Sequence, residues 1–289
     1  MVARIRKETL LAHLQNLVGD RNAITRRREL QHASDYITQQ FRSLGYDTST
    51  DDVRRLWRNY PNIVAEWPPA RADLPLFIVG AHYDTVLGSP GADDNASGVA
   101  ALLEIMRVVR SSLDGNRERR LQFVAFTLEE EGMAGSAHYV RTLSERGANV
   151  NGMVSLEMVG YKSDAANSQQ LPQGLEHLYP HVGNFIGVVG NNTSRALLEA
   201  FVASMKSVDG LPVESLIVPG NGETIPPTRL SDHSPFWDHG YRALMITDTS
   251  WFRNPHYHQA SDMIETLDLD FMARVAEGAA RAVETMLGV

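Results

Sequence analysis

The chain has 289 residues, of which 43% are hydrophobic and 21% are charged, an ordinary composition for a globular protein. This length can bury a large core and allows one or two domains. The formal net charge of -8 and the lack of an extended basic stretch argue against nucleic-acid binding. Because the chain has no cysteine, disulfides and thiol chemistry are excluded.

No apolar run approaches the length that spans a bilayer, so no membrane association is expected. The first twenty residues carry charges throughout and lack the apolar core of an export signal. The sequence therefore predicts a cytoplasmic protein, or a secreted or periplasmic one if the chain has been trimmed at its start. It makes no prediction of the oligomeric state.

The first predicted element is a helix over about residues 26–44, where apolar residues recur at helical spacing and Gly45 marks the end. Short apolar runs follow and predict strands over residues 62–67, 76–83, 121–128, 153–158, 184–190 and 243–247. Helical patterns between and after these runs cover residues 97–110, 136–143, 194–206 and 268–287.

Several of the predicted strands are apolar at every position, which is typical of strands covered on both faces. Alternation of such strands with helices predicts a three-layer α/β/α sandwich, with a mostly parallel mixed sheet and helices on both faces. We interpret residues 1–289 as a single domain. The polar stretches near residues 162–181 and 219–230 are predicted to be loops at the rim of a site.

Histidines and carboxylates gather where these strands are predicted to end. They are His82 with Asp84, Asp94 in "GADDNASG", Glu129 to Glu131, Glu157, and His256 with His258. Taken singly, such residues are more often helix caps or surface residues. Because carboxyl ends of parallel strands meet at one edge of a sheet, five segments of this kind predict a shared site.

Histidine and carboxylate without thiolate suit zinc, and also cobalt or manganese. A catalytic zinc ion needs about three protein ligands and an open position. His82, Asp94, Glu157, His258 and one glutamate of the triplet can therefore serve two ions if one carboxylate bridges them. Divalent cations would also explain the crowding of acids, which otherwise forces some of them to take up protons.

The segments "HYDTV", "GADDNASG", "LEEEG", "LEM" and "NPHYH", in this order, resemble the co-catalytic dizinc exopeptidases of metallopeptidase family twenty-eight. The resemblance covers roughly residues 82–262. It implies two Zn²⁺ per chain, with Co²⁺ or Mn²⁺ as substitutes. It also implies an aminopeptidase that hydrolyses N-terminal residues from peptides with a free N-terminus.

The resemblance further implies a role for each ligand. Asp94 would bridge the two ions, and its peptide bond to the next residue, Asn95, would be cis. His82 and Glu157 would complete one metal site, and Glu130 and His258 would complete the other.

The neighbouring acids receive roles from the same resemblance. In the family, one residue separates the glutamate pair from a segment such as "GMAGS", so Glu129 would be the general base. Glu131 would then fill the spacer and face solvent. Asp84 would orient His82, which fixes the tautomer of the ring.

Two features depart from the family pattern. Glu157 stands where some members have aspartate. "PPTRLSDHSPF" lacks the tyrosine that stabilises the oxyanion in some aminopeptidases, which leaves Arg229 as the candidate. A salt-bridged loop arginine is the alternative reading, and His233 and His256 are expected not to bind metal. Several aromatic residues are expected either to line a pocket for the first side chain or to belong to the core: Tyr161, Phe236, Trp251, Phe252 and Tyr257.

Three alternatives to an aminopeptidase remain at this point. The first is a carboxypeptidase, because the metal centre does not decide whether the N-terminal or the C-terminal residue of a peptide is cleaved. A glutaminyl cyclase shares the fold but uses a single zinc, and a peptidase-like binding module has lost its ligands. Here all five ligand positions and the base are filled, which favours a hydrolase.

Overall fold

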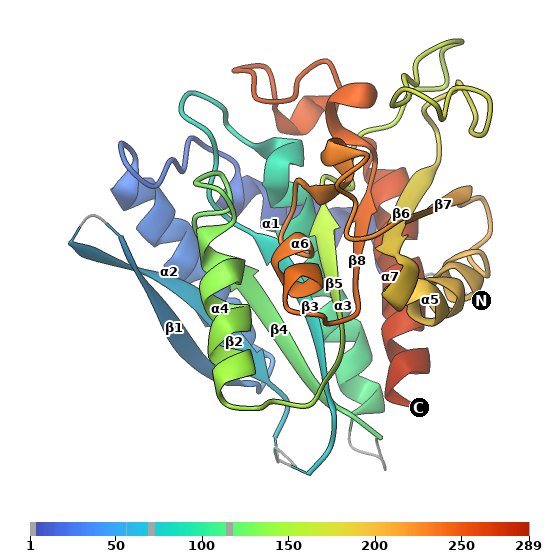
Figure 1. Ribbon diagram of the computed structural model, residues 1–289. Coiled ribbons are helices and arrows are strands. Elements are labelled where there is room, and N and C mark those ends of the chain that lie inside the picture. The colour runs from blue at the N-terminus through green and yellow to red at the C-terminus, as the bar shows by residue number, and fades with distance from the viewer. Residues whose placement is uncertain (1–3, 56, 69–72, 114–117, 289) are drawn as a thin grey trace.

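The computed structural model describes residues 4–55, 57–68, 73–113 and 118–288. They form an eight-stranded sheet in the order β1-β2-β4-β3-β5-β8-β6-β7, with helices on both faces (Figure 1). The β1/β2, β2/β4 and β6/β8 pairs are antiparallel and the other neighbours are parallel. The predicted three-layer fold with a mostly parallel mixed sheet is therefore confirmed. Among the described residues, no helix is both long and apolar enough to cross a membrane.

The strands are β1 (Asp47–Arg55), β2 (Arg58–Glu66), β3 (Leu76–His82), β4 (Arg120–Phe126), β5 (Val150–Glu157), β6 (Ile186–Asn191), β7 (Val213–Val218) and β8 (Ala243–Thr247). The α-helices are α1 (Lys7–Leu17), α2 (Arg27–Ser43), α3 (Gly98–Val109), α4 (Ala134–Glu145), α5 (Arg195–Met205), α6 (Ser234–Asp238) and α7 (Leu269–Leu287).

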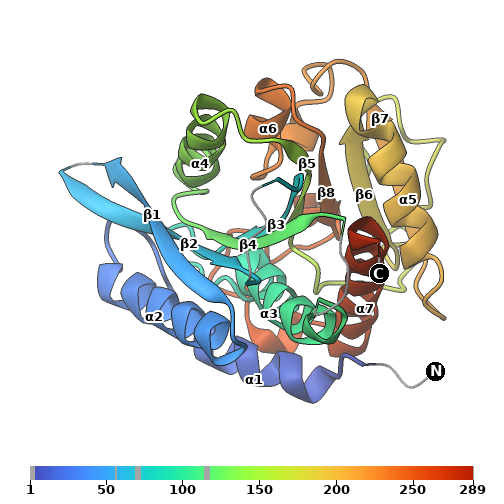
Figure 2. The same ribbon diagram turned by 90° about the horizontal axis from the view of Figure 1, so that it is seen from below.

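The sheet separates two apolar clusters. The larger lies between the sheet and α1, α2, α3, α5 and α7, and the smaller lies on the face that carries α4 and α6 (Figure 2). Side chains alternate between the faces, as strand geometry requires: Leu244 and Ile246 of β8 join the larger cluster, whereas Ala243 and Met245 join the smaller. The layers thus match the apolar runs of the sequence.

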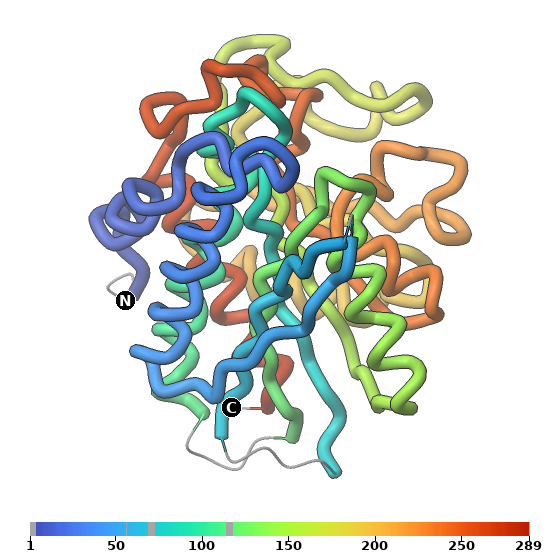
Figure 3. Tube along the Cα trace, turned by 90° about the vertical axis from the view of Figure 1, so that its left-hand side faces the viewer, coloured from blue at the N-terminus to red at the C-terminus, as the bar shows by residue number. Residues whose placement is uncertain are grey.

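All five predicted helices are present, as α2, α3, α4, α5 and α7, with ends within two residues of the prediction. The sequence patterns do not predict α1, α6, β1 or β7. β1 reads "DTSTDDVRR" and is mostly exposed, because it pairs with one neighbour only. It forms a hairpin with β2 that projects from the molecule in Figure 1 and faces the viewer in Figure 3. Such an edge strand leaves no apolar pattern to detect.

A buried arginine joins the N-terminal segment to the loops that follow β3. Arg21 is 2% exposed, and its guanidinium donates hydrogen bonds to the carbonyl oxygens of Tyr83 at 2.9 Å and Gly91 at 3.1 Å. It also donates to carbonyl oxygens of Leu17, Gly19 and Pro90. Burial lowers the pKa of Arg21 to about 10, so the side chain stays charged at neutral pH. One side chain therefore ties the chain on both sides of residues 84–89 to the N-terminal segment.

We predict that Arg21→Met lowers the free energy of unfolding by about 3 kcal/mol or more. Each buried carbonyl left without a donor costs about 1–3 kcal/mol. Arg26→Met is the matched control, because Arg26 is exposed and, among the residues that the structure describes, its side chain pairs only with Asp20, at 3.2 Å. It should cost less than about 1 kcal/mol. Urea unfolding of both variants measures the difference, and equal midpoints would show that Arg21 does not hold these loops.

Candidate metal centre

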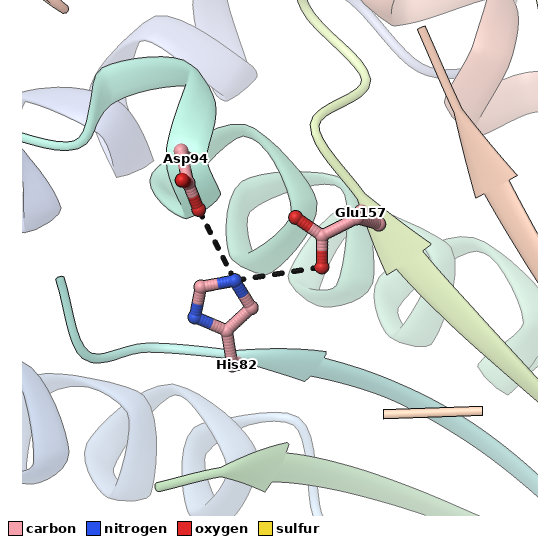
Figure 4. A group of neighbouring side chains, drawn as sticks. All are labelled: His82, Asp94 and Glu157. Atoms are coloured by element: carbon pink, nitrogen blue, oxygen red, sulfur yellow. Dashed lines mark ion pairs between the residues drawn. The ribbon is translucent and has the colours of Figure 1, made fainter. Parts of the chain in front are cut away.

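Five side chains meet beyond the carboxyl ends of neighbouring strands. His82 ends β3, Glu157 ends β5, Glu130 follows β4, His258 follows β8, and Asp94 lies in the helical turn η1 (Ala92–Ser97) before α3. Their ligand atoms form two groups, and within each group the atoms lie within 4.8 Å of one another. His82, Asp94 and Glu157 make one group, shown in Figure 4, and Asp94, Glu130 and His258 make the other.

Asp94 belongs to both groups. Its Oδ1 lies 3.2 Å from Nε2 of His82, and its Oδ2 lies 3.1 Å from Nε2 of His258. The two oxygens of one carboxylate thus face different histidines. The peptide bond between Asp94 and Asn95 is cis, and it lies within the turn that places this carboxylate.

Several atoms of the cluster are buried without hydrogen-bond partners. Among the described residues, no hydrogen bond is found for either ring nitrogen of His82 or for Oδ1 of Asp94, although Nε2 and Oδ1 face each other at 3.2 Å. Buried polar atoms are normally hydrogen-bonded, so orphaned atoms that converge on one point call for a further group. Imidazole nitrogens and carboxylate oxygens are donors that zinc accepts.

The charges of the cluster favour a cation as that group. Burial raises the pKa of Glu130 to about 7, and the negative charge of Asp94 adds to the shift. Burial also raises the pKa of Glu129 well above its ordinary value. Although burial alone would lower it, hydrogen bonds to Asp94 and Glu130 raise the pKa of His258 to about 10. The site therefore holds more negative charge than its own residues balance, and bound cations would relieve this excess.

Two further carboxylates hold the backbone around the cluster. Asp84 accepts hydrogen bonds from the backbone N–H groups of Glu129 at 3.1 Å and Glu130 at 3.3 Å. It also lies 3.7 Å from Nδ1 of His82, which is an ion-pair distance longer than a hydrogen bond. Asp262 accepts from the N–H group of Asp94 at 3.1 Å and from that of the preceding residue at 2.8 Å. These bonds position main chain that carries the candidate ligands.

The backbone next to the cluster takes up conformations that L-residues rarely adopt. Leu128, just before Glu129, has φ 56°, and Met158, just after Glu157, has φ 47°. His258 itself has φ 58°. Left-handed non-glycine residues cost free energy, and they concentrate at functional sites because the surrounding structure enforces them there.

Arg229 does not join the cluster. Its guanidinium donates to both carboxylate oxygens of Asp238, at 3.0 and 2.8 Å, and to the carbonyl oxygen of Asn221 at 2.7 Å. This is the salt-bridged loop arginine that the sequence left as the alternative. The geometry therefore gives no support to Arg229 as an oxyanion residue.

The expectation that Glu131 faces solvent is wrong. Its carboxylate pairs with Arg55 at 2.9 Å, and its side chain is 22% exposed. The reason is that the β1–β2 hairpin, which the sequence patterns do not predict in full, brings Arg55 to this turn. His256 lies outside both groups, where its Nδ1 is 2.9 Å from the hydroxyl of Ser261.

Sequence reasoning gives no role to other buried acids near the site. Asp93 accepts hydrogen bonds from Asn254 at 2.7 Å and from the N–H group of Gly160 at 3.0 Å, and Asp248 lies beside it. Asp232 is fully buried, and burial raises its pKa to about 7. The only sequence signals are the doubled aspartate of "GADDN" and the "SDH" segment, and neither reveals burial.

A cavity of about 290 Å³ opens beside the cluster. Glu129, Glu130 and His258 contribute to its lining, together with residues from both long polar stretches of the sequence. Of the aromatic residues considered above, Trp251, Phe252 and Tyr257 line it. Phe236 is buried in the smaller apolar cluster, and Tyr161 is not part of the lining.

Comparison with known proteins supports the same chemistry. Residues 62–283 match peptidase family M28. The chain is 38% identical over 263 residues to "Uncharacterized protein YfbL" of Escherichia coli, covering 86% of this chain and 78% of that protein. It is 27% identical to a "Probable leucine aminopeptidase" of Trichophyton verrucosum, over 96% of this chain and 73% of the relative.

Solved structures agree in fold. LapA of Legionella pneumophila aligns with a TM-score of 0.78 and 25% identity, over 98% of this chain and 74% of that chain. A glutaminyl cyclase of Macrostomum lignano aligns with a TM-score of 0.76 and 17% identity, over 99% of this chain and 91% of that chain, which shows a shared fold alone. With most of its length matched and the predicted fold in place, the chain belongs to peptidase family M28 and is a peptide hydrolase.

Proposed function

We propose that this protein is a co-catalytic dizinc aminopeptidase. The observation that carries the proposal is the position of Asp94, whose two carboxylate oxygens face His82 and His258 separately. One carboxylate shared by two groups of three ligands suits a pair of zinc ions close to each other. The orphaned nitrogens of His82 and the excess negative charge support the same conclusion.

In this proposal, His82 and Glu157 would hold one zinc ion, Glu130 and His258 would hold the other, and Asp94 would be shared by both. When bound, the two ions would lower the pKa of a water molecule and polarise the scissile carbonyl. Ser231 donates a hydrogen bond of 2.8 Å to Oε2 of Glu157, which fixes the direction of that carboxylate.

Glu129 is proposed as the general base. It belongs to neither ligand group, yet it lines the cavity beside them. Its carboxylate would take a proton from the attacking water and pass it to the leaving amine. Asp84 holds the N–H group of Glu129 at 3.1 Å and thereby positions the base.

Tyr257 takes the place of Arg229 as our candidate for stabilising the oxyanion. It lines the cavity, and its ring stacks on that of His258 with centroids 3.7 Å apart. Burial and the charges of Asp94 and Glu130 raise the pKa of Tyr257, so its hydroxyl stays protonated and can donate a hydrogen bond. Its place in the cavity lining beside a candidate ligand supports this role.

The direction of peptide cleavage follows from charge. A free α-amine is a cation at neutral pH, and Glu129, a carboxylate of the cavity lining that would bind no zinc, can attract it. The same carboxylate would repel the C-terminal carboxylate of a peptide. This favours N-terminal over C-terminal exopeptidase action.

We predict that acetylation of the N-terminus of a good peptide substrate abolishes its cleavage, because the amide has no charge for the acids to bind. Conversion of its C-terminus to an amide should change kcat/KM little. Chromatography of the products measures both effects. Cleavage lost on C-terminal amidation alone would indicate a carboxypeptidase, and ammonia release with ring closure of N-terminal glutamine would indicate a cyclase.

We predict that the three adjacent glutamates respond differently to substitution. Glu129→Gln removes a proton acceptor without changing size, so kcat should fall by about 10²–10⁴. About two zinc ions per chain should remain, since a dinuclear site is kept. Glu130→Gln replaces an anionic ligand with a weak neutral one, so one zinc should become loosely bound and added zinc should restore part of the activity. Elemental analysis and steady-state kinetics on each variant give the two readouts.

Glu131→Gln is the matched control. It removes the same charge from the same turn but loses only the partly buried pair with Arg55, so zinc content should not change and kcat should fall by less than about threefold. Zinc loss in Glu131→Gln together with full activity in Glu129→Gln would show that the roles are shifted by one residue. Full activity of rigorously metal-free protein would refute the dizinc assignment itself.

A further inference from the structure

A row of paired residues crosses the sheet from the metal centre to a second carboxylate. Glu157 of β5 pairs with Thr247 of β8, Thr247 pairs with Gly187 of β6, and Gly187 pairs with Glu214 of β7. Directly paired residues place their side chains on the same face of a sheet. The row therefore runs from a candidate zinc ligand to an acid on the edge strand.

The row lies on the face that carries the smaller apolar cluster. The next row towards the interior consists of Met245, Val189 and Leu216, paired in the same order, and all three pack in or against that cluster. Because side chains alternate along β7, Glu214 points to the same side as Leu216. Glu214, Leu216, Val189 and Met245 all line the cavity.

The floor of the cavity is open along this row. Gly187 has no side chain, so nothing rises from the sheet between Thr247 and Glu214 at that position. The walls above the row are largely apolar, with Trp251 and Phe252 stacked at 5.0 Å between centroids. A long side chain with an apolar stem fits such a channel.

The length of the row sets the length of that side chain. Three steps between strands of about 4.8 Å each place the backbones of Glu157 and Glu214 about 14 Å apart. An extended lysine reaches roughly 6 Å from its Cα, so it covers a little more than one strand spacing of this row. The side chain of Glu214 stands roughly perpendicular to the sheet, so its carboxylate would meet the charged end from the floor of the channel.

Within the described part of the chain, Glu214 forms no ion pair. Tyr179 lies close enough for the charge of Glu214 to add to burial in raising the pKa of Tyr179, whose hydroxyl donates to the carbonyl oxygen of Ser215 at 2.9 Å. A half-buried carboxylate at the end of an apolar channel is thus free to pair with a charge on a ligand.

We propose that the cavity binds the side chain of an N-terminal lysine or arginine, with Glu214 as the residue that pairs with its charged end. The inference rests on the proposed aminopeptidase function, which places the α-amine of the substrate at the metal centre. The methylene stem lies over Thr247 and Gly187, and the cationic end meets the carboxylate of Glu214.

The experiment compares substrates that differ only in the terminal charge. Zinc-loaded protein and its Glu214→Gln variant are assayed with aminoacyl anilides of lysine and norleucine, and of arginine and citrulline. The wild-type protein should prefer lysine over norleucine and arginine over citrulline. Glu214→Gln should lower kcat/KM for both cationic substrates by about 10- to 100-fold, the range for a hydrogen bond to a charged group. Both neutral substrates should keep their kcat/KM.

Glu199→Gln is the control, because this substitution removes the same formal charge. Glu199 is exposed on α5, on the opposite face of the sheet. It should leave all four values unchanged. If norleucine and citrulline are cleaved but Glu214→Gln affects them as much as lysine and arginine, the inference about Glu214 fails while the aminopeptidase function stands. If zinc-loaded wild-type protein releases none of these residues or leucine, the proposed function fails, and this inference fails with it.

Discussion

Electrostatic repulsion among several carboxylates at one buried edge of the sheet is the constraint on which the site and its surroundings depend. Glu129 and Glu130 both have raised pKa values, and Asp94 lies between two histidines that only partly balance the charge. Without a cation, protons must take up the excess, and a protonated acid is a poor ligand and a poor base. The same crowding that disfavours an empty site makes it selective for divalent ions, so the folded chain stores part of the metal-binding free energy as electrostatic repulsion.

The turns that carry the candidate ligands are held largely by hydrogen bonds to their main chain. Substitution of a ligand side chain would leave these hydrogen bonds in place. Asp84 binds the N–H groups of the glutamate turn, and Asp262 binds those of the turn that carries Asp94. Arg21 supplies the complementary half of this arrangement by binding carbonyl oxygens. It lies outside residues 62–283, the part that matches the family, so the N-terminal segment adds support to a centre that it does not itself line.

The sequence predicted what depends on local pattern. The buried strands and long helices have periodic apolar residues, and the strand ends bring His82, Glu157 and the glutamates together because parallel strands point one way. It could not predict what depends on distant partners. The polar edge strand β1 has no apolar pattern, so the sequence did not predict the hairpin that brings Arg55 to Glu131. Arg229 resembled a catalytic residue until Asp238, nine positions away along the chain, proved to be its partner.

The pairing of Glu157, Thr247, Gly187 and Glu214 across neighbouring strands has a consequence for how this protein can diverge. Backbone hydrogen bonds fix the distance between neighbouring strands at about 4.8 Å. Each strand along the row therefore adds a length close to that of four carbon–carbon bonds in an extended substrate side chain. A bulky residue in place of Gly187 or Thr247 would shorten the channel by about one strand spacing. In the proposed aminopeptidase, selectivity for the first residue would thus be set on β6, β7 and β8, which carry no proposed metal ligand, so it could change without altering the reaction centre.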